Sequence, residues 1–294
     1  MQRAERVLVL GGTGFLGSHF VRSLGKRAVA HTTKKNYQEA NVNFREMVFQ
    51  KNQIDDIKVF LEKENCGTIV NCVALADIEK CEQDQKLAYW LNCELPEILA
   101  TISKSLGSRF VHISTDAVFD GSARLRTEED CPSPLSIYGK SKLDGEQLVL
   151  ESYPESLVAR VNFFGHSDNK PSIFNFFYEN LISQRSVSGF TDVFFTPLYV
   201  IDLVNAIMEL LTLNTSGLVH VVGSERMSKY DFGLLIAEIF NLPATFLKKG
   251  LMSGSNGAAL RSLDLSLSND KIRSLGINLP SVRDGLSILK KNIV

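Results

Sequence analysis

The sequence lacks the features that mark several large classes of protein. Its 32 Lys and Arg residues nearly balance its 33 Asp and Glu residues, which leaves a net charge of -1. A balanced charge provides no electrostatic footprint for nucleic acid or for an acidic membrane surface. The longest apolar helical stretch, 200–213, is interrupted by Asp202, Asn205 and Glu209 and is too short to cross a bilayer. The sequence therefore predicts neither a nucleic-acid-binding protein nor a membrane protein.

Cysteine and histidine are few and are not grouped. The five cysteines form an odd set without CxxC spacing, and the five histidines are scattered. This pattern argues against a disulfide framework and against a metal site. An apolar segment and a glycine-rich loop begin so early that no signal peptide is expected before them. We therefore expect a cytoplasmic protein without a bound metal, whose cysteines are buried reduced thiols. These cysteines are Cys66, Cys72, Cys81, Cys93 and Cys131.

The chain does contain a regular alternation of apolar strands and helical patterns. With 44% hydrophobic and 22% charged residues it has the composition of a globular protein that buries a sizeable core. Strand-like runs occur at 7–10, 28–33, 43–49, 68–74, 109–115 and 157–161. Helical patterns lie between them, to about residue 24 and at 54–65, 84–106 and 136–153. This alternation predicts an α/β fold with a doubly wound parallel (Rossmann) sheet.

The pattern changes after about residue 162. Helical stretches at 172–184, 199–213 and 228–241 surround one more strand at 218–222, and a loop rich in glycine and serine follows at 248–256. Ser228 and Asp231 resemble a helix capping box. We therefore expect a Rossmann domain at 1–161, to which 196–222 returns. We expect 162–195 and 223–294 to form a smaller C-terminal α/β lobe that binds the substrate.

A glycine-rich loop follows the first strand and opens the first helix. It reads Gly12-x-Gly14-x-x-Gly17, and also Gly11-x-x-Gly14-x-x-Gly17. In this context the missing side chains let a pyrophosphate approach the backbone and the helix N-terminus. A tight strand-to-helix turn without a ligand is the alternative. The pattern predicts a dinucleotide site that includes Gly11, Thr13, Gly14, Phe15, Leu16 and Gly17.

The end of the second strand lacks the acidic residue that usually binds the ribose of NAD. That acid stands about 20 positions after the glycine loop in such sites. Here the segment 31–35 reads His-Thr-Thr-Lys-Lys, and the first acid after it is Glu39. Lys34 and Lys35 either pair with a 2′-phosphate or are solvated turn lysines. The sequence favours NADPH over NADH, with Thr33 and Lys34 among the residues that bind it.

Tyr138 and Lys142 are four residues apart, so a helix places them on one face. Free tyrosine titrates near pH ~10, which makes it a poor proton donor at neutral pH. One ammonium about 4 Å away stabilises the phenolate by about 4 kcal/mol at an effective dielectric of about 20, which is equivalent to lowering the tyrosine pKa by about 3 units. The pair therefore predicts a tuned proton donor, against the alternative of a solvated helix face.

Together these residues resemble an extended short-chain dehydrogenase/reductase, and most closely the dTDP-4-dehydrorhamnose reductases. Segment 114–121 is similar to the Ser-Thr-Asp-Tyr-Val-Phe-Asp-Gly stretch of that family. Segment 71–74 resembles its Asn-Ala-Ala-Ala segment along the cofactor, and 133–146 resembles its Tyr-Gly-x-x-Lys-x-x-Gly-Glu block. Segments 196–203 and 220–232 resemble two further blocks of the family, so the resemblance covers nearly the whole chain.

The resemblance implies a reaction and the residues that perform it. The family reduces the 4-keto group of a nucleotide-activated deoxysugar with NAD(P)H, as in dTDP-rhamnose and cell-surface polysaccharide biosynthesis. By this resemblance Tyr138 supplies the proton. Lys142 lowers the pKa of Tyr138 and bonds the nicotinamide ribose. Thr115 donates a hydrogen bond to the ketone oxygen. A hydroxyl that caps a turn is the alternative for Thr115. The cofactor residues carried over are Cys72, Val73, Ala74, Asn92, Tyr138 and Lys142.

Three residues are expected to contact the substrate: Asp116, Ala117 and Asn162. Ala117 replaces the family's tyrosine beside the sugar pocket, which puts the exact sugar in doubt. Asp116 is either a substrate contact or a turn-capping acid. Arg160 either binds a substrate phosphate or forms an ion pair at the end of the sheet.

Two other functions remain open. The regulatory β-subunit of methionine adenosyltransferase resembles this same fold and binds NADP without catalysis, although the complete set of Thr115, Tyr138 and Lys142 argues against that role. Another nucleotide-sugar 4-reductase or a 4-epimerase is the second alternative. Some family members dimerise through magnesium held partly by a C-terminal glutamate. The last acid here is Asp284, so no metal is carried over, and a homodimer stays open.

Overall fold

The computed structural model describes residues 2–38, 42–167, 172–252 and 262–293. The chain forms two compact units. The first unit comprises Met1–Thr115, Ser136–Ala159 and Leu211–Val219. The second comprises Asp116–Leu135, Arg160–Leu210 and His220–Val294.

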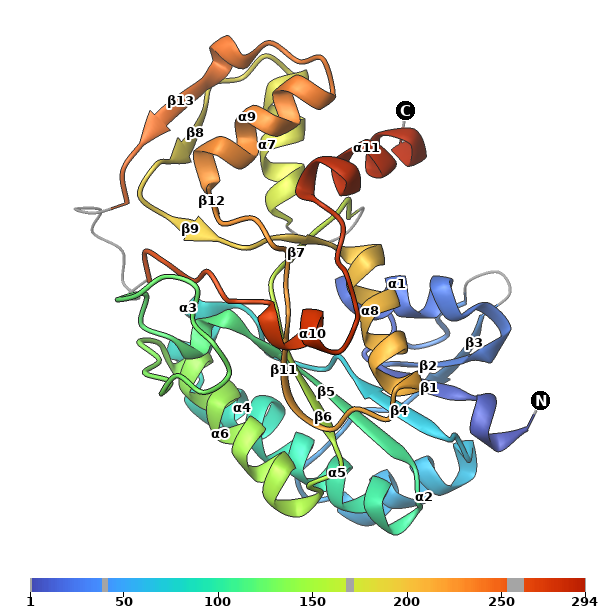
Figure 1. Ribbon diagram of the computed structural model, residues 1–294. Coiled ribbons are helices and arrows are strands. Elements are labelled where there is room, and N and C mark those ends of the chain that lie inside the picture. The colour runs from blue at the N-terminus through green and yellow to red at the C-terminus, as the bar shows by residue number, and fades with distance from the viewer. Residues whose placement is uncertain (1, 39–41, 168–171, 253–261, 294) are drawn as a thin grey trace. The chain divides into compact units, whose positions relative to one another are not determined.

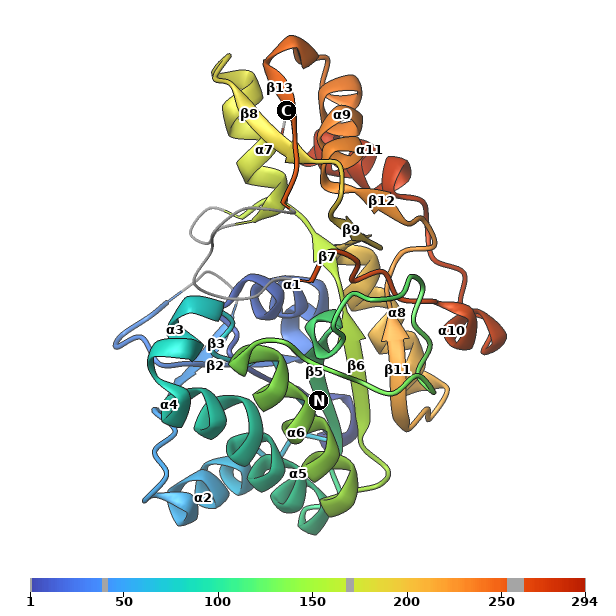
Figure 2. The same cartoon turned by 90° about the vertical axis from the view of Figure 1, so that its left-hand side faces the viewer.

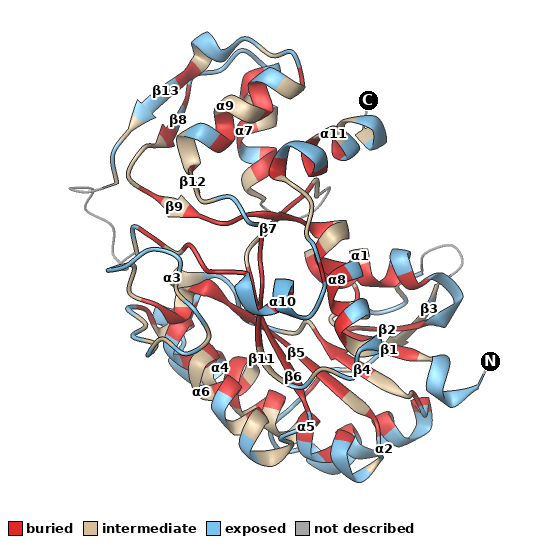
Figure 3. Cartoon of the chain, in the orientation of Figure 1, coloured by how far each residue is buried: buried red, intermediate tan, exposed pale blue. Residues whose placement is uncertain are grey.

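The central sheet has seven parallel strands in the order β11-β6-β5-β4-β1-β2-β3 (Figure 1). The strand order reverses at β1, which pairs with both β2 and β4. Most residues of these strands are buried, because helices cover the sheet (Figure 3). The prediction of a doubly wound parallel sheet is confirmed. The strands are β1 (Val7–Leu10), β2 (Ala28–Thr32), β3 (Asn43–Glu46), β4 (Thr68–Asn71), β5 (Arg109–Thr115), β6 (Leu157–Val161) and β11 (Gly217–Val221).

Helices of the first unit lie on both faces of its strands. Helix α1 lies on one face, while α2, α4, α5 and α6 lie on the other (Figures 1 and 2). Among the described residues, the α-helices of this unit are α1 (Phe15–Leu24), α2 (Ile54–Glu64), α3 (Ile78–Gln83), α4 (Gln85–Tyr89), α5 (Leu95–Ser105) and α6 (Ile137–Ser152). The main core lies between strands and helices and includes Leu8, Leu10, Ile69, Phe110, Val158, Leu61, Leu99 and Val149. Burial of these apolar side chains holds the sheet and helices together.

The helix predicted at 84–106 is interrupted. A π-helical turn, Trp90–Glu94, separates α4 from α5, and α3 precedes them as an additional short helix. The sequence reasoning missed this interruption because a π-turn, which has i→i+5 instead of i→i+4 hydrogen bonds, changes the side-chain pattern over only about one turn. Such turns often occur at functional sites. Here the turn contains Asn92, which is fully buried.

The second unit packs short strands and helices around an aromatic core. Phe164, Phe177 and Phe195 all lie within 6.4 Å of Phe232 between ring centroids. Its strands are β7 (Phe163–Phe164), β8 (Val187–Phe190), β9 (Phe194–Phe195), β10 (Leu198–Tyr199), β12 (Met227–Ser228) and β13 (Leu247–Gly250). Its helices are α7 (Ile173–Ile182), α9 (Lys229–Ile239), α10 (Asp270–Ser274), α11 (Val282–Ile293) and most of α8 (Val200–Thr212).

Two details of the second unit test the sequence predictions directly. The capping box is confirmed, because Ser228 Oγ accepts from the Asp231 N–H at 3.0 Å and Asp231 reaches back to the Ser228 N–H. The prediction of a loop at 248–256 is wrong for residues 248–250, because β13 extends to Gly250 and pairs with β8 in parallel. Strand β8 supplies hydrogen-bond partners that no local pattern reveals. Residues 253–256 of that loop lie outside the described part of the chain.

The cysteines are all free, as expected, but they are not all buried. Cys66, Cys81 and Cys93 are buried, whereas Cys131 is exposed. Among the described residues, no group of three or more His, Cys, Asp or Glu side chains is placed to hold a metal ion. Within the same ranges, no helix combines the length and the apolar character needed to cross a membrane.

Candidate active site

The glycine loop forms a close turn between β1 and α1. Gly11 has a φ of +75°, and its carbonyl accepts from the Gly14 N–H at 2.8 Å. A Cβ built on Gly17 would lie 2.2 Å from that carbonyl oxygen, so only glycine fits there. No side chain caps the N-terminus of α1 at Gly14. The first N–H groups of α1 therefore suit an anionic group. The turn and the first residues of α1 contain all six predicted positions, Gly11, Thr13, Gly14, Phe15, Leu16 and Gly17.

A buried histidine that the sequence reasoning missed supports this loop. His31 Nδ1 accepts from the Gly11 N–H at 3.1 Å, and His31 Nε2 lies 2.8 Å from the Met47 carbonyl. Burial lowers the pKa of His31 to about 4, so the imidazole is neutral and its Nε2–H donates to Met47. A histidine after a glycine loop carries no recognisable motif, and only the pairing of β1 with β2 reveals this contact.

The residues predicted to select the cofactor lie at the end of β2. Thr33, Lys34 and Lys35 are exposed there. The Lys34 N–H donates to Thr32 Oγ1 at 3.0 Å, and Thr32 Oγ1 lies 3.3 Å from Thr13 Oγ1. This contact ties the predicted 2′-phosphate site to the glycine loop within the first unit. The choice between a phosphate contact and a solvated turn stays a prediction.

Asn92 holds the segment after β4 in place. Asn92 Oδ1 accepts from the Leu75 N–H at 2.8 Å. Asn92 Nδ2 donates to the Leu75 carbonyl and to Ser141 Oγ, both at 3.1 Å. The side-chain amide is thus occupied by the chain itself at both ends. Its evident role is to join the predicted cofactor segment, Cys72, Val73 and Ala74, to helix α6, while a direct contact with the cofactor stays a prediction.

Lys142 reaches strand β5 from α6 and is fully buried. Its Nζ donates to the Ile113 carbonyl at 2.6 Å and lies 3.1 Å from His112 Nε2. Burial lowers the pKa of Lys142 to about 8, although the carboxylate of Glu146 and the sulfur of Cys72 act in the opposite direction. Tyr138 lies one turn earlier in the same helix and is half-buried.

Helix α6 is fastened to β5 next to the third predicted catalytic residue. Ser114 Oγ donates to Glu146, and Ser114 directly precedes Thr115 at the end of β5. The side chain of Ser136 caps α6 by accepting from the Gly139 N–H at 3.1 Å. The structure therefore places Thr115, Tyr138 and Lys142 in the first unit, on two elements that are bonded to each other.

The predicted substrate residues belong to the second unit. Asn162 Nδ2 donates to the Asp116 carboxylate, which is buried, so the structure brings these two predictions together. Ala117 follows in a 3-10 turn, Asp116–Val118. Lys229, which the sequence reasoning missed, has its Nζ 3.1 Å from the centroid of the Phe195 ring. Burial lowers the pKa of Lys229 to about 7, and the Asp116 charge opposes that shift.

Arg160 is buried in the second unit, where it contacts Phe119 and His220. Its guanidinium lies 5.1 Å from the centroid of Phe119, and Nη1 is 3.4 Å from His220 Nε2. The His220 N–H donates to Glu128 at 2.7 Å, and burial lowers the pKa of His220 to about 3. These contacts describe a packed guanidinium inside the unit, whereas a role in binding substrate phosphate stays a prediction.

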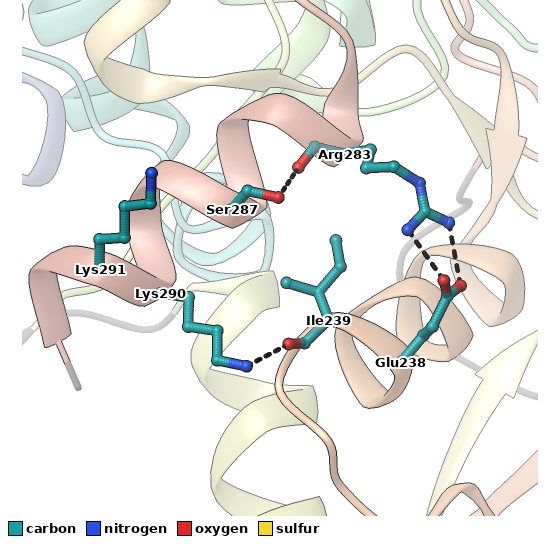
Figure 4. Close-up of a pocket in the computed structure, with 6 residues that line it drawn as sticks. All are labelled: Glu238, Ile239, Arg283, Ser287, Lys290 and Lys291. Carbon is teal, nitrogen blue, oxygen red and sulfur yellow. Dashed lines mark hydrogen bonds and ion pairs between the residues drawn. The ribbon is translucent and has the colours of Figure 1, made fainter.

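A surface pocket of about 590 Å³ lies between α9 and α11 (Figure 4). Arg283 forms two bonds of 2.8 and 2.9 Å with Glu238 across it, and Lys290 donates to the Ile239 carbonyl. None of the predicted site residues lines this pocket. This pocket and the candidate active site therefore consist of different residues.

The chain is similar to known proteins over nearly its whole length. Residues 5–293 match the family model described as the RmlD substrate binding domain. The chain belongs to this family. It is 30% identical over 290 residues to a probable low-salt glycan biosynthesis reductase of Haloferax volcanii, and the match covers 96% of each chain. It is also 31% identical over 284 residues to mouse methionine adenosyltransferase 2 subunit beta, which covers 93% of this chain and 83% of that one.

Solved structures of this sugar-nucleotide reductase and epimerase type share the fold. A hypothetical dTDP-4-dehydrorhamnose reductase from Sulfolobus tokodaii has a TM-score of 0.82 at 30% identity, and the match covers 95% of this chain and 98% of that chain. A dTDP-4-dehydrorhamnose reductase from Bacillus anthracis, solved in complex with NADP, has a TM-score of 0.83 at 24% identity, with 98% and 99% covered. The second likeness supports the fold only.

The burial of Lys142 predicts a specific pH dependence of stability. Its pKa is 10.5 when exposed and about 8 in the folded chain, so the unfolded state binds more protons between these values. The free energy of unfolding should therefore rise by about 3 kcal/mol, at ~1.4 kcal/mol per pKa unit, from pH 8 to 10.5. Lys142→Met should lack this part of the rise. Urea denaturation of both proteins across this range gives the difference, and parallel curves would contradict the assigned pKa. Other titrating groups, Lys229 among them, cancel in the comparison.

Proposed function

We propose that the chain reduces the 4-keto group of a nucleotide-activated deoxysugar with NADPH. Its membership in the RmlD family makes it a protein of the sugar-nucleotide reductase and epimerase type. Relatives at 30% identity are named as a probable low-salt glycan biosynthesis reductase and a hypothetical dTDP-4-dehydrorhamnose reductase. The observation that carries the proposal is the bonding of α6, with Tyr138 and Lys142, to the strand that ends in Thr115.

The first unit fits a dinucleotide. A side chain at Gly17 would collide with the Gly11 carbonyl, and the uncapped start of α1 leaves N–H groups for a pyrophosphate. The cofactor, when bound, supplies the hydride. In the proposal, Thr115 donates a hydrogen bond that orients the ketone, and Tyr138 donates the proton to its oxygen. Lys142 sets the charge beside Tyr138, and Asp116 with Asn162 contacts the sugar.

The choice of NADPH over NADH depends on Lys34 and Lys35. We expect the Lys34→Ala/Lys35→Ala double variant to bind NADPH at least about 10-fold more weakly, because a charged hydrogen bond to phosphate contributes about 1.5–3 kcal/mol. Binding of NADH should stay within about a factor of two. Isothermal titration with both cofactors measures this, with Lys63→Ala, another exposed lysine of the first unit, as control. An equal loss for NADH would remove the 2′-phosphate assignment.

A non-catalytic regulatory role is the second candidate. It is favoured by the 31% identity to mouse methionine adenosyltransferase 2 subunit beta over 83% of that protein. Such a chain would bind NADP through the same glycine loop but would consume no sugar nucleotide. An epimerase would hold its nicotinamide tightly and show no net consumption either.

A panel of nucleotide 4-keto sugars, followed by NADPH absorbance, separates these functions. We expect NADPH oxidation with a dTDP-4-keto-6-deoxy sugar or a close relative. Product analysis by mass spectrometry reports a gain of two hydrogens for a reductase and no mass change for an epimerase. Intact NADPH binding without turnover on any member of the panel would overturn the reductase proposal and favour the regulator.

A further inference from the structure

Three buried polar side chains form a chain of contacts from β4 through β5 to α6. Asn71 Nδ2 lies 3.2 Å from His112 Nδ1, and His112 Nε2 lies 3.1 Å from Lys142 Nζ. Asn71 and His112 face each other in the parallel register of β4 and β5. All three side chains are at most 1% exposed, so water does not complete their hydrogen bonds. The donors and acceptors must therefore match within the chain itself.

Asn71 determines which nitrogen of His112 carries the proton. The Asn71 oxygen accepts from the Val73 N–H at 3.1 Å, so its NH₂ group faces His112. An NH₂ group only donates, and therefore His112 Nδ1 must present its lone pair. Burial holds the pKa of His112 well below its usual value, so the imidazole is neutral and has a single N–H. That proton is on Nε2.

The Nε2 proton of His112 points at Lys142. An ammonium has three donors and no acceptor, so it cannot bond to an N–H group. An uncharged amine has a lone pair that accepts from Nε2–H, and it keeps N–H groups for the Ile113 carbonyl at 2.6 Å. A charged Lys142 would require the other tautomer of His112 and a flipped Asn71, which would lose the bond to the Val73 N–H.

We propose that His112 is a positioning residue whose Nε2–H donates to the amine of Lys142 and stabilises the uncharged lysine, with Asn71 selecting the tautomer. Neither the family match nor the named relatives assign a role to His112. Its effect on the reaction rests on the proposed function, since the charge on Lys142 tunes Tyr138. His112 then sets the pH above which the tuned proton donor is lost.

The other ionisable groups around Lys142 act against His112. Glu146, on the same helix, and Cys72, after β4, both favour the charged lysine. The Cys72 thiol is itself uncharged near neutral pH, because desolvation raises its pKa to about 12. Burial and the His112 contact therefore both favour the uncharged lysine. Only the carboxylate of Glu146, which also accepts from Ser114 Oγ, favours the charged form among the groups named here.

The tautomer of His112 is directly measurable in the unmodified chain. A long-range ¹H–¹⁵N correlation spectrum of histidine-labelled protein distinguishes the protonated ring nitrogen from the unprotonated one. The His112 signals are those that disappear in His112→Phe. We expect the proton on Nε2 well above pH 8, where Lys142 is uncharged. A proton on Nδ1, or a doubly protonated ring, at that pH would overturn the proposal without recourse to any variant that fails to fold.

The sign of the pKa change in a variant provides the second test. His112→Phe removes a donor to the amine, so the pKa of Lys142 should rise by about 0.7 unit, the equivalent of one hydrogen bond of ~1 kcal/mol. If His112 instead accepted from the ammonium, the same variant would lower that pKa. Titration of the ¹³C-labelled lysine Cε signal, assigned with Lys142→Met, measures it. A fall or no change overturns the proposal.

His220→Phe is the matched control. It removes another buried neutral histidine, one that belongs to the second unit and bonds the Ser268 carbonyl. It should leave the pKa of Lys142 unchanged, so a general loss of packing cannot imitate the effect. All these measurements are made without substrate, so their outcomes do not depend on the proposed reaction.

The pH profile of kcat/KM connects the lysine to the reaction. In His112→Phe the alkaline limb of this profile should move to higher pH by the same amount as the pKa of Lys142. In His220→Phe the limb should stay at the same pH. An unmoved limb in an active variant whose lysine pKa has shifted would overturn the link to catalysis. A parent chain without any turnover would instead refute the proposed function while the tautomer and the lysine pKa still test the role of His112.

Discussion

Tyr138→Phe is expected to lower turnover by about 10² to 10⁴-fold, the range that a positioned general acid contributes. The substitution removes one oxygen from a half-buried side chain in the first turn of α6. The helix cap at Ser136 and the contacts of Lys142 with β5 do not depend on that oxygen. The loss should therefore appear in kcat, and the Kd for NADPH should stay within about a factor of two.

Steady-state NADPH oxidation and a cofactor titration measure the two quantities separately. Tyr153→Phe makes the same chemical change at the C-terminal end of the same helix and should keep normal turnover. Near-normal oxidation by Tyr138→Phe with a dTDP-4-keto-6-deoxy sugar would contradict its assignment as the acid. Loss of NADPH binding in parallel with turnover would show a structural effect rather than a missing proton.

Gly145→Ala is expected to destabilise the first unit strongly. A Cβ at this position would lie 2.1 Å from the Asn92 carbonyl oxygen and 3.1 Å from its carbon. Both atoms belong to the backbone of the π-helical turn, so no flexible side chain can move aside. Helix propensity alone predicts the opposite sign, since alanine is favoured over glycine inside a helix by ~1 kcal/mol. We expect the clash to prevail, with a loss of about 3 kcal/mol or more.

The measurement is the free energy of unfolding by urea, together with turnover. Because α6 carries Tyr138 and Lys142, its displacement should lower turnover as well. Gly233→Ala in α9 is the comparison. There the nearest atoms, at 3.0–3.1 Å, belong to the side chains of Phe177 and Leu247, which can shift, so the loss should be smaller. A Gly145→Ala variant at least as stable as the parent would contradict the close approach of α6 to the π-turn.

Local patterns were sufficient for most of the sheet and its helices. The predicted strands at 7–10, 109–115 and 157–161 agree residue for residue with β1, β5 and β6. Strand β1 is a continuous apolar run, and β5 and β6 are buried along nearly their whole length, which leaves a signal in the strand itself. Gly14 and Gly17 are readable for the same reason, since a side chain at either position would meet the Gly11 carbonyl only a few residues away.

Non-local contacts explain what the sequence reasoning missed. Strand β13 contains two exposed lysines and a glycine, and it is a strand only because β8 supplies its hydrogen-bond partners. The π-turn depends on the burial of Asn92 against Leu75 and Ser141, which lie 17 and 49 residues away along the chain. In both cases the energy that decides the local structure comes from a distant segment.

The spacing of Tyr138 and Lys142 was sufficient to predict a shared helix face and a proton donor beside a cation. The sequence by itself also determined the doubly wound fold, because hydrophobic periodicity and turn residues act locally. Only the tertiary structure decided what surrounds the lysine. Asn71 and His112 come from two neighbouring strands, and their register places a single imidazole proton in front of Lys142. Whether that lysine is charged depends on burial and on these partners, which no spacing along the chain encodes.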